Sequence, residues 1–440
     1  KTWIRLRKLN SNSKGDRRLT LRWTPQPTGD AIVDIVLSLN EQAKAMHGTE
    51  VATASYSSLK PSLTSLDAIA RKIEEVEKDI RNLEGHPGRY LRSMLNAKGY
   101  FVRSLQGDDL PYAEYIANIQ ELPSTLIPEE TMAGHRNLVE EGLTNLGYQG
   151  TLKEKAESWL KETLIAPDKV VEVAESMKDK SKIGTLQRVI GLPEEDGIDY
   201  IKSIRGVFWS GYSKYTGDFR GNLTFNIDRP WTEPVLAQIM THEGYPGHQA
   251  FYCRWDYLFQ QGELPLEASY YLINTPTNAL FEGGPESALH FLGWDRDEEE
   301  TEGIPLAQKA QYKLARDWID MQRMAMTNAC YLFNIGEMDK AEAVAYMMEK
   351  GLLGEIEANN CYRFFSDPIQ KTYYPSYYYG RWMVGKAYDS VSKEQRADFF
   401  KILYDTPHTT NTFIDAVSEL SGRKFQPFEQ VKTAKEDFVL

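Results

Sequence analysis

The segment MTHEGYPGHQAFY, residues 240–252, holds two histidines and an acidic residue in an arrangement that suits metal chemistry. Neutral imidazoles are common zinc ligands, and a carboxylate beside one of them can take a proton from water. Zinc hydrolases usually carry His-Glu-x-x-His on one helix. Here His242 and Glu243 are followed by His248, which comes two positions later than that pattern requires.

The Pro-Gly pair between the histidines bears on whether both can reach one ion. In a regular helix, residues six apart point about 120° away from each other. Pro246 cannot donate a hydrogen bond to the carbonyl of His242, and Gly247 allows backbone angles that other residues resist. We therefore expect a bulge or a break here, which would return His248 to the side of His242. The alternative is a pair of core histidines that hold no ion.

Two acids in the segment NALFEGGPESALHFLG, residues 278–293, are candidates to complete the site. A catalytic zinc needs a third protein ligand and an open position. We assign Glu282 to the ion, and Glu286, one helical turn later, to the ring N–H of His242. The two roles could be exchanged, because Pro285 obscures where the helix starts, and His290 is a weaker candidate for either role. Glu243 is expected to act as the general base.

Three stretches resemble the bacterial DUF885 family, a domain of unknown function. HEGYPGHQ resembles its His-Glu-x-x-Pro-Gly-His signature, and FEGG resembles its Phe-x-Glu-Gly-Trp-Ala segment. RFFSDPIQ followed by SYYYG is similar to its Arg-Tyr, Pro-x-Gln and Ser-Tyr-x-x-Gly stretch. The resemblance covers residues 100–440 and implies a zinc peptidase-like protein with a mostly helical fold, similar to the carboxypeptidase Taq family. Gln249 departs from it, since the family often has a second histidine there, and Gly284 and Pro285 replace Trp-Ala.

The third match implies roles for tyrosines and arginines near the C-terminus. A phenol or guanidinium aimed at the former carbonyl oxygen stabilises the negative charge that forms during acyl hydrolysis. The Ser-Tyr-x-x-Gly match implies Tyr377 for this role, with Tyr378 as the second choice. Arg363 or Arg381 could bind a substrate carboxylate through a bidentate contact. Aromatic packing and surface charge are the alternative explanations for each of these residues.

Helical patterns dominate the elements that must position these residues. Apolar residues at spacings of three and four predict a helix over 64–84. Further helices are expected within 128–147, 151–164, 167–180, 305–333, 339–351 and 392–405, and over 232–243 with Thr232 as its N-cap. Residues 222–230 alternate as one half-buried strand, and 210–221 suit a loop or hairpin. That strand could pair with an extended peptide or could simply close the fold.

These elements predict a mainly α protein with a large helical metallopeptidase-like fold, of the gluzincin or carboxypeptidase Taq type. A small β element is expected next to the active-site helix. We expect residues 1–100 to be an N-terminal helical segment that walls or covers a cleft. Residues 101–440 would form the helical catalytic body.

The composition limits the partners. The 440 residues carry a formal charge of −12, which disfavours nucleic acid and anionic membrane surfaces. No apolar run is long enough to span a bilayer. Three widely separated cysteines give neither a zinc-finger spacing nor a disulfide framework, so free thiols and a cytoplasmic location are expected. The chain starts without a signal peptide, which leaves room for a leader that has been removed.

The sequence therefore predicts a zinc-dependent hydrolase with one Zn²⁺ per chain. A carboxypeptidase-type metallopeptidase that cleaves short peptides is the preferred prediction. One alternative is a helical protein that has lost catalysis and binds a peptide or a partner in the same cleft. The other is a metal-dependent amidase that acts on a small non-peptide substrate. The sequence does not indicate the oligomeric state.

Overall fold

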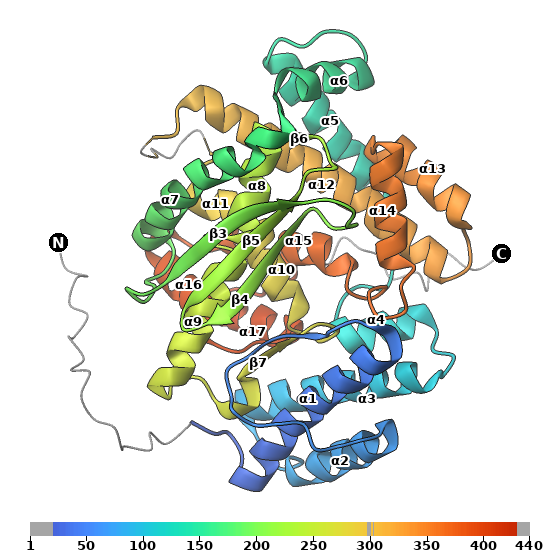
Figure 1. Ribbon diagram of the computed structural model, residues 1–440, viewed down its shortest axis with the longest axis vertical. Coiled ribbons are helices and arrows are strands. Elements are labelled where there is room, and N and C mark those ends of the chain that lie inside the picture. Colours follow the sequence, from blue (N-terminus) through green and yellow to red (C-terminus); the bar gives the residue numbers. More distant parts are fainter. Residues whose placement is uncertain (1–20, 297–300, 302, 429–440) are drawn as a thin grey trace.

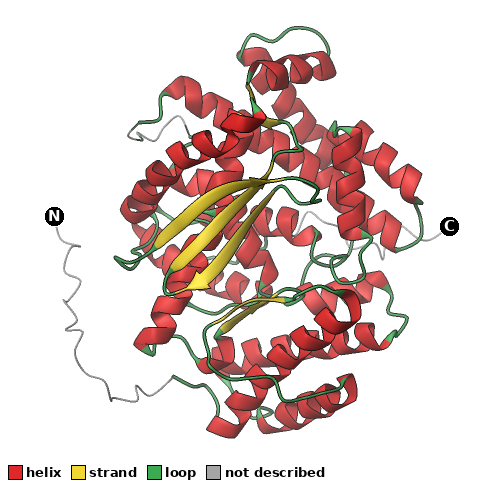
Figure 2. Cartoon of the chain, viewed as in Figure 1, coloured by secondary structure: helices red, strands yellow, loops and turns green. Residues whose placement is uncertain are grey.

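The computed structural model describes residues 21–296, 301 and 303–428, and helices dominate this part of the chain (Figures 1 and 2). The first half contributes α1 (Gln26–His47), α2 (Leu66–Asp79), α3 (Gly85–Gln106), α4 (Tyr112–Gln120), α5 (Glu129–Asn145), α6 (Leu152–Glu162) and α7 (Val170–Arg188). The second half contributes α8 (Glu233–Glu243), α9 (His248–Gln261), α10 (Asn278–Glu286), α11 (Ala288–Leu292), α12 (Leu306–Asn334), α13 (Lys340–Gly351), α14 (Glu355–Phe365), α15 (Pro375–Ser390), α16 (Arg396–Asp405) and α17 (Thr410–Ser421). The prediction of a mainly α fold is confirmed.

Short 3-10 turns and strands connect the helices. The 3-10 turns are η1 (Pro167–Lys169), η2 (Leu266–Ala268) and η3 (Lys393–Gln395). The strands are β1 (Ala52–Ser55), β2 (Leu164–Ile165), β3 (Gly197–Ile204), β4 (Gly211–Gly217), β5 (Arg220–Asn226), β6 (Trp231–Thr232) and β7 (Tyr270–Leu272). Two pairs, β1 with β7 and β2 with β6, are antiparallel and very short.

The central sheet is larger than the sequence indicated. Its order is β3-β5-β4, with β5 parallel to β3 and antiparallel to β4. The expected strand over 222–230 is β5, shifted toward the N-terminus, and 210–221 do form part of a hairpin. Because both edges of β5 are occupied, it cannot pair with a substrate peptide, so of the two alternatives the strand that closes the fold is the one that fits. The edge strand β4 has this capacity instead.

The N-terminal helices belong to the main core. Ile69, Ile73 and Val76 give α2 one buried face, as the spacing predicts, and Ser65 caps the helix. This face shares a hydrophobic cluster with Phe399 of α16 and Phe413 of α17. In Figure 1, α1, α2 and α3 lie together at the bottom of the molecule, below the sheet. The helices expected to cover a cleft therefore pack as part of the core.

The sheet lies across α8 and α9, the helices that carry the histidine motif (Figure 1). Thr232 accepts a hydrogen bond from the Val235 amide at the start of α8, so the predicted N-cap is confirmed. Thr241 and Met240 are fully buried, which fixes the end of α8 inside the protein. Among the described residues, no helix combines the length and apolar character that crossing a bilayer needs.

Candidate metal centre

The helix is interrupted between the two histidines, as the Pro-Gly pair predicts. Helix α8 ends at Glu243, the Tyr245–Pro246 peptide bond is cis, and α9 starts at His248. A Cβ on Gly247 would lie 1.8 Å from the carbonyl oxygen of His242, so only glycine fits this approach. The imidazole rings of His242 and His248 are 4.7 Å apart between centroids and nearly perpendicular. The expectation that the break brings the two rings together is confirmed.

Helix α10 brings Glu282 to both rings. Nε2 of His242 lies 3.4 Å from one carboxylate oxygen of Glu282, and Nε2 of His248 lies 3.6 Å from the other. One donor atom from each of the three residues lies within 4.8 Å of the others, and all three side chains are buried. Glu286 lies on the opposite side of the His242 ring, 3.6 Å from Nδ1. This geometry suits the predicted assignment of Glu282 and Glu286 better than its exchange.

The donor set fits a divalent cation. Oε2 of Glu282 and Nδ1 of both histidines are buried without a hydrogen-bond partner, which is unfavourable for polar atoms inside a protein. Three carboxylates, those of Glu243, Glu282 and Glu286, surround the rings. Arg323 pairs with Glu286 at 2.8 Å. A dication would balance the other two, and two imidazoles with one carboxylate are a frequent zinc set.

The pKa values reflect this excess of negative charge. Burial opposes charge on His242, but Glu282, Glu286 and Glu243 outweigh it and raise the pKa of His242 to about 9. Burial, together with the charges of Glu282 and Glu286, raises the pKa of Glu243 to about 7. Burial and the neighbouring His242 hold the pKa of His248 well below its ordinary value. His248 is therefore neutral and able to donate a lone pair at neutral pH.

Glu243 lies next to the His242–His248–Glu282 cluster and close to strand β4. Its side chain is buried and lines a cavity together with His242. A Cβ on Gly211 of β4 would lie 3.0 Å from the Glu243 carboxylate, so the strand passes close to it. The carboxylate of the predicted general base therefore packs against this strand.

Two tyrosines of the C-terminal segment reach the cluster. Tyr377 stacks on His242 with ring centroids 6.3 Å apart, and Tyr373 donates a hydrogen bond to Glu282. Burial raises the pKa of Tyr377 well above its ordinary value, so its phenol stays a donor. Helices α10 and α15 approach each other closely at Gly380. A Cβ on Gly380 would lie 2.3 Å from the carbonyl oxygen of Ala279, so the approach requires glycine. The glycine of the SYYYG stretch therefore allows Tyr377 to approach Glu282.

The other predicted side chains lie away from the cluster. Tyr378 and Arg381 face a second cavity of about 230 Å³, where Arg381 bonds Ser287 and lies 3.9 Å from Asp320. Neighbours on a helix point about 100° apart, which explains why Tyr377 and Tyr378 face different cavities. Arg363 is exposed and stacks over Phe208. His290 binds Asp295 and Asp389 rather than the cluster.

Arg323 of α12 was not predicted from the sequence. Besides pairing with Glu286, it donates to the Tyr374 hydroxyl at 3.2 Å and stacks 4.2 Å from the Tyr377 ring centroid. Arg323 thus connects Glu286, the acid beside His242, to Tyr377, whose ring stacks on His242. Its place among methionines in DMQRMAM was the available signal.

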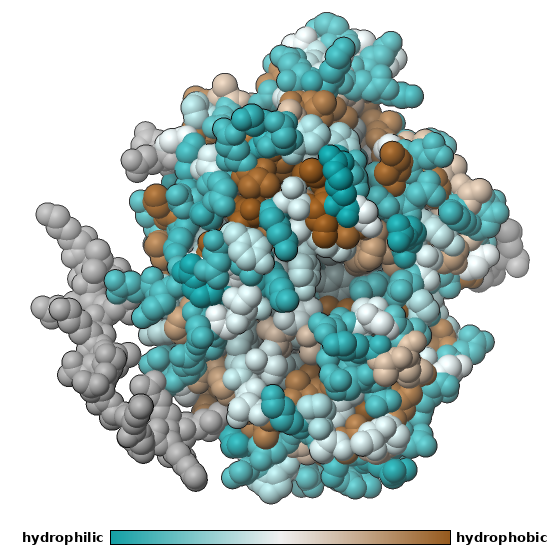
Figure 3. All heavy atoms as spheres, viewed as in Figure 1, coloured by the Kyte–Doolittle hydropathy of each residue, from teal (hydrophilic) through white to brown (hydrophobic). Residues whose placement is uncertain are grey.

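A cavity of about 610 Å³ opens beside His242 and Glu243. Its walls come from the loops at the ends of β3, β5 and β6 and from α8, α12, α14 and α15. In chain order, the lining residues begin with Leu160. The described helices before residue 107 do not line it. Figure 3 shows hydrophobic side chains gathered above the sheet on the side of α14. The volume is in the range of small-molecule sites.

Comparison with known proteins identifies the fold but no activity. No family model matches the chain, and no curated protein matches it. A solved structure described as "the putative lipoprotein from Colwellia psychrerythraea" is 14% identical with a TM-score of 0.56, over 91% of this chain and 77% of the other. A "putative lipoprotein of unknown function from Shewanella oneidensis" is 13% identical with a TM-score of 0.44, over 83% and 72%. The first likeness shows a shared helical fold and nothing more.

Proposed function

We propose that the chain is a zinc-dependent hydrolase, a metallopeptidase of carboxypeptidase type that acts on short peptides. The observation that carries the proposal is the convergence of His242, His248 and Glu282, with Glu243 next to them at the wall of a cavity. The resemblance of HEGYPGHQ to the signature of DUF885, a family whose fold is similar to that of the carboxypeptidase Taq family, supports the same class. A cytoplasmic location stays a prediction, and the lipoprotein wording belongs to the two structural neighbours.

Each nearby side chain has a chemical role in this proposal. His242, His248 and Glu282 would hold zinc, which when bound supplies Lewis acidity toward the scissile carbonyl and toward water. Glu243 would accept the proton of the attacking water and pass it to the leaving amine. Tyr377 would donate a hydrogen bond to the oxygen that becomes negative. Arg323 and Glu286 would hold the His242 ring in place.

The cavity favours small substrates. Its volume of about 610 Å³ accommodates a few residues of an extended peptide rather than a folded chain. The edge strand β4 beside Glu243 offers backbone groups to such a peptide. The arginines Arg363 and Arg381, predicted to bind a carboxylate, lie elsewhere, so another group must receive it.

Elemental analysis of the purified protein and of two ligand variants tests the proposal. We expect about one zinc per chain in the native protein and a loss of zinc in His242→Ala and His248→Ala. His290→Ala is the matched control and should keep the metal, because His290 contacts Asp295 and Asp389. Native protein that takes up no metal when zinc is supplied would overturn the proposal and favour a peptide-binding protein.

A substrate screen then distinguishes peptidase from amidase. Dipeptides with a free C-terminal carboxylate should be hydrolysed by the zinc-loaded protein, whereas dipeptides with a blocked C-terminus and small non-peptide amides should not. Metal binding with turnover only of non-peptide amides would replace the peptidase by an amidase.

A further inference from the structure

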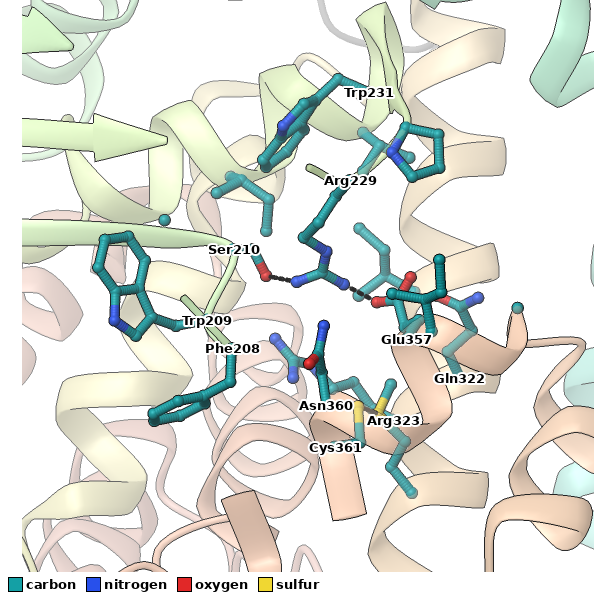
Figure 4. Close-up of a pocket in the computed structure, with 18 of the residues that line it drawn as sticks. Phe208, Trp209, Ser210, Arg229, Trp231, Gln322, Arg323, Glu357, Asn360 and Cys361 are labelled. Carbon is teal, nitrogen blue, oxygen red and sulfur yellow. Dashed lines mark hydrogen bonds and ion pairs between the residues drawn. The ribbon is translucent and has the colours of Figure 1, made fainter. Parts of the chain in front are cut away.

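Two arginines face the proposed catalytic cavity, and the metal cluster uses only one of them. Arg323 of α12 pairs with Glu286, while Arg229 extends from the loop between β5 and β6. Their side chains are only 17% and 16% exposed. In Figure 4 the Arg229 guanidinium points into the cavity, above the nitrogen atoms of Arg323 and Asn360. Two buried cations in the wall of one cavity favour the entry of an anion.

The present anion at Arg229 comes from the protein itself. Glu357, in the first turn of α14, forms an ion pair with Arg229, and the Ser210 hydroxyl is its second partner (Figure 4). The pair joins the sheet side of the cavity to α14. Nε of Arg323 is buried without a hydrogen-bond partner, so the Arg323 guanidinium can still donate a hydrogen bond to a ligand. A ligand carboxylate would therefore meet a guanidinium that is already engaged by a chemically equivalent group.

The surroundings of Arg229 define what such a ligand carries next to its carboxylate. Large apolar and aromatic side chains form much of the cavity wall, among them Trp231, Ile239, Trp318, Met326, Ile356 and Phe364. Cavities of this kind take apolar groups, and their few polar residues fix the orientation. The combination fits the last residue of a peptide, with a bulky apolar side chain beside a free carboxylate.

We propose that Arg229 receives the C-terminal carboxylate of a peptide with a bulky apolar last residue, and that Glu357 holds this place until the peptide displaces it. The inference rests on the proposed peptidase function, to which it adds the end of the substrate that is recognised and a built-in competitor. A guanidinium binds a carboxylate through two parallel hydrogen bonds, so one carboxylate replaces the other on the same donors. Glu357 lies on the first turn of α14, where the helix dipole still stabilises its charge once it is released.

Binding of a pair of matched probes tests the inference without turnover. N-acetyl-phenylalanine and its C-terminal amide differ only in the carboxylate, and calorimetry measures their affinity for the native protein. We expect the acid to bind at least about tenfold more tightly than the amide, as a charge-assisted contact implies. Arg229→Gln should remove this difference, with the affinity for the amide unchanged.

Glu357→Gln is the more decisive variant, because we expect it to increase the affinity for the acid. Freed from its competitor, Arg229 should bind the acid about tenfold more tightly, while the amide is unaffected. Glu355→Gln is the matched control, since Glu355 lines the same cavity on the same helical turn. Native discrimination between acid and amide that persists in Arg229→Gln, or no gain in Glu357→Gln, would overturn the proposal and make the pair a brace between the sheet and α14.

The two proposals fail in different ways. If the protein holds no zinc but Arg229 and Glu357 control acid binding as described, the recognition site stands and the hydrolase does not. If the protein hydrolyses peptides with free and amidated ends equally well and neither variant changes this, the hydrolase stands and this inference fails.

Discussion

Glu243 follows a proposed metal ligand directly, and its carboxylate lines the cavity instead of joining the three-residue cluster. Glu243→Gln keeps the shape of the side chain but removes its ability to accept a proton. We expect kcat on a short peptide to fall by about 10²–10⁴-fold, while zinc content measured by elemental analysis stays that of the native protein. A variant that loses both zinc and activity would instead place Glu243 among the ligands.

The charge around His242 predicts how zinc affinity depends on pH. Before an ion binds, the pKa of His242 is raised to about 9 by the neighbouring carboxylates. The proton must leave before the nitrogen can bind a cation, so the apparent affinity should fall about tenfold for each pH unit below about 9. Titration calorimetry between about pH 6.5 and 8.5, in buffers of different ionisation enthalpy, measures both the affinity and the proton released. An affinity independent of pH would contradict the raised pKa.

At the residue scale, the sequence predicted those candidate site residues that lie close together in the chain. His242, Glu243 and His248 share one short segment, and chemistry alone indicated their roles. Arg229 and Arg323 could not be predicted in the same way, because their meaning depends on contacts with distant Glu357 and Glu286. The choice between Tyr377 and Tyr378 depended on the rotation of α15, which a motif match does not fix.

At the scale of elements, the α8–α9 break is the feature on which the site depends. In Gly247→Ala the new methyl would overlap the carbonyls of His242 and Thr241, so the break must open. We expect a loss of about 2–4 kcal/mol of unfolding free energy and a weaker zinc site, measured by denaturant titration and metal analysis. Gly134→Ala is the control, since a Cβ in that part of α5 meets nothing within 4 Å. Zinc affinity equal to the native value in Gly247→Ala would show that His248 is not a ligand.

Helices were easier to predict than strands for a physical reason. Over α5, α12 and α13 the apolar spacing matched the helical period, and the observed bounds agree with the predicted ranges. The pattern of β3 is different, because Asp199, Tyr200 and Lys202 alternate poorly and stay exposed at a sheet edge. Its pairing with β5 is long-range, and such pairing leaves little trace in local sequence.

At the scale of the whole molecule, a contact between half-buried His86 and buried His408 joins the N-terminal and C-terminal parts. His86 of α3 and His408, just before α17, have ring centroids 4.7 Å apart. Burial, with the neighbouring His86, lowers the pKa of His408 to about 3. His408 therefore stabilises the fold above about pH 6.5, the value of the unfolded chain, and this contribution is lost as the pH falls toward 3.

His408→Gln tests this acid sensitivity. Between about pH 7 and pH 5 the native protein should lose about 2 kcal/mol more unfolding free energy than the variant, since over that range His408 takes up a proton in the unfolded chain but not in the fold. Guanidinium denaturation at both pH values gives the comparison. Equal losses in the two proteins would mean that His408 is already protonated in the fold.

The sequence does not show how the first hundred residues relate to the site. They were expected to wall or cover a cleft, and in the structure Ile69 and Val76 belong to the same hydrophobic cluster as residues of the C-terminal helices. Amphipathic spacing shows that a helix has a buried face and does not show against which partner it packs. Coarse class and local motif were therefore predictable, whereas the assembly of distant parts was not.

The pairing of β1 with β7 has a consequence for the dynamics of the chain. Ala52 and Ala54 pair with Leu272 and Tyr271, and the segment that follows β7 leads directly into α10 and Glu282. If zinc binds at Glu282 as proposed, it would stabilise only conformations in which α10 is in place, so by linkage it would also oppose the opening of β1. Hydrogen exchange at the amides of residues 52–55 should slow when zinc is added, and unchanged exchange would show that β1 opens independently. Slower exchange would mean that the stability of β1 depends on whether zinc is bound, although β1 does not contact the ion.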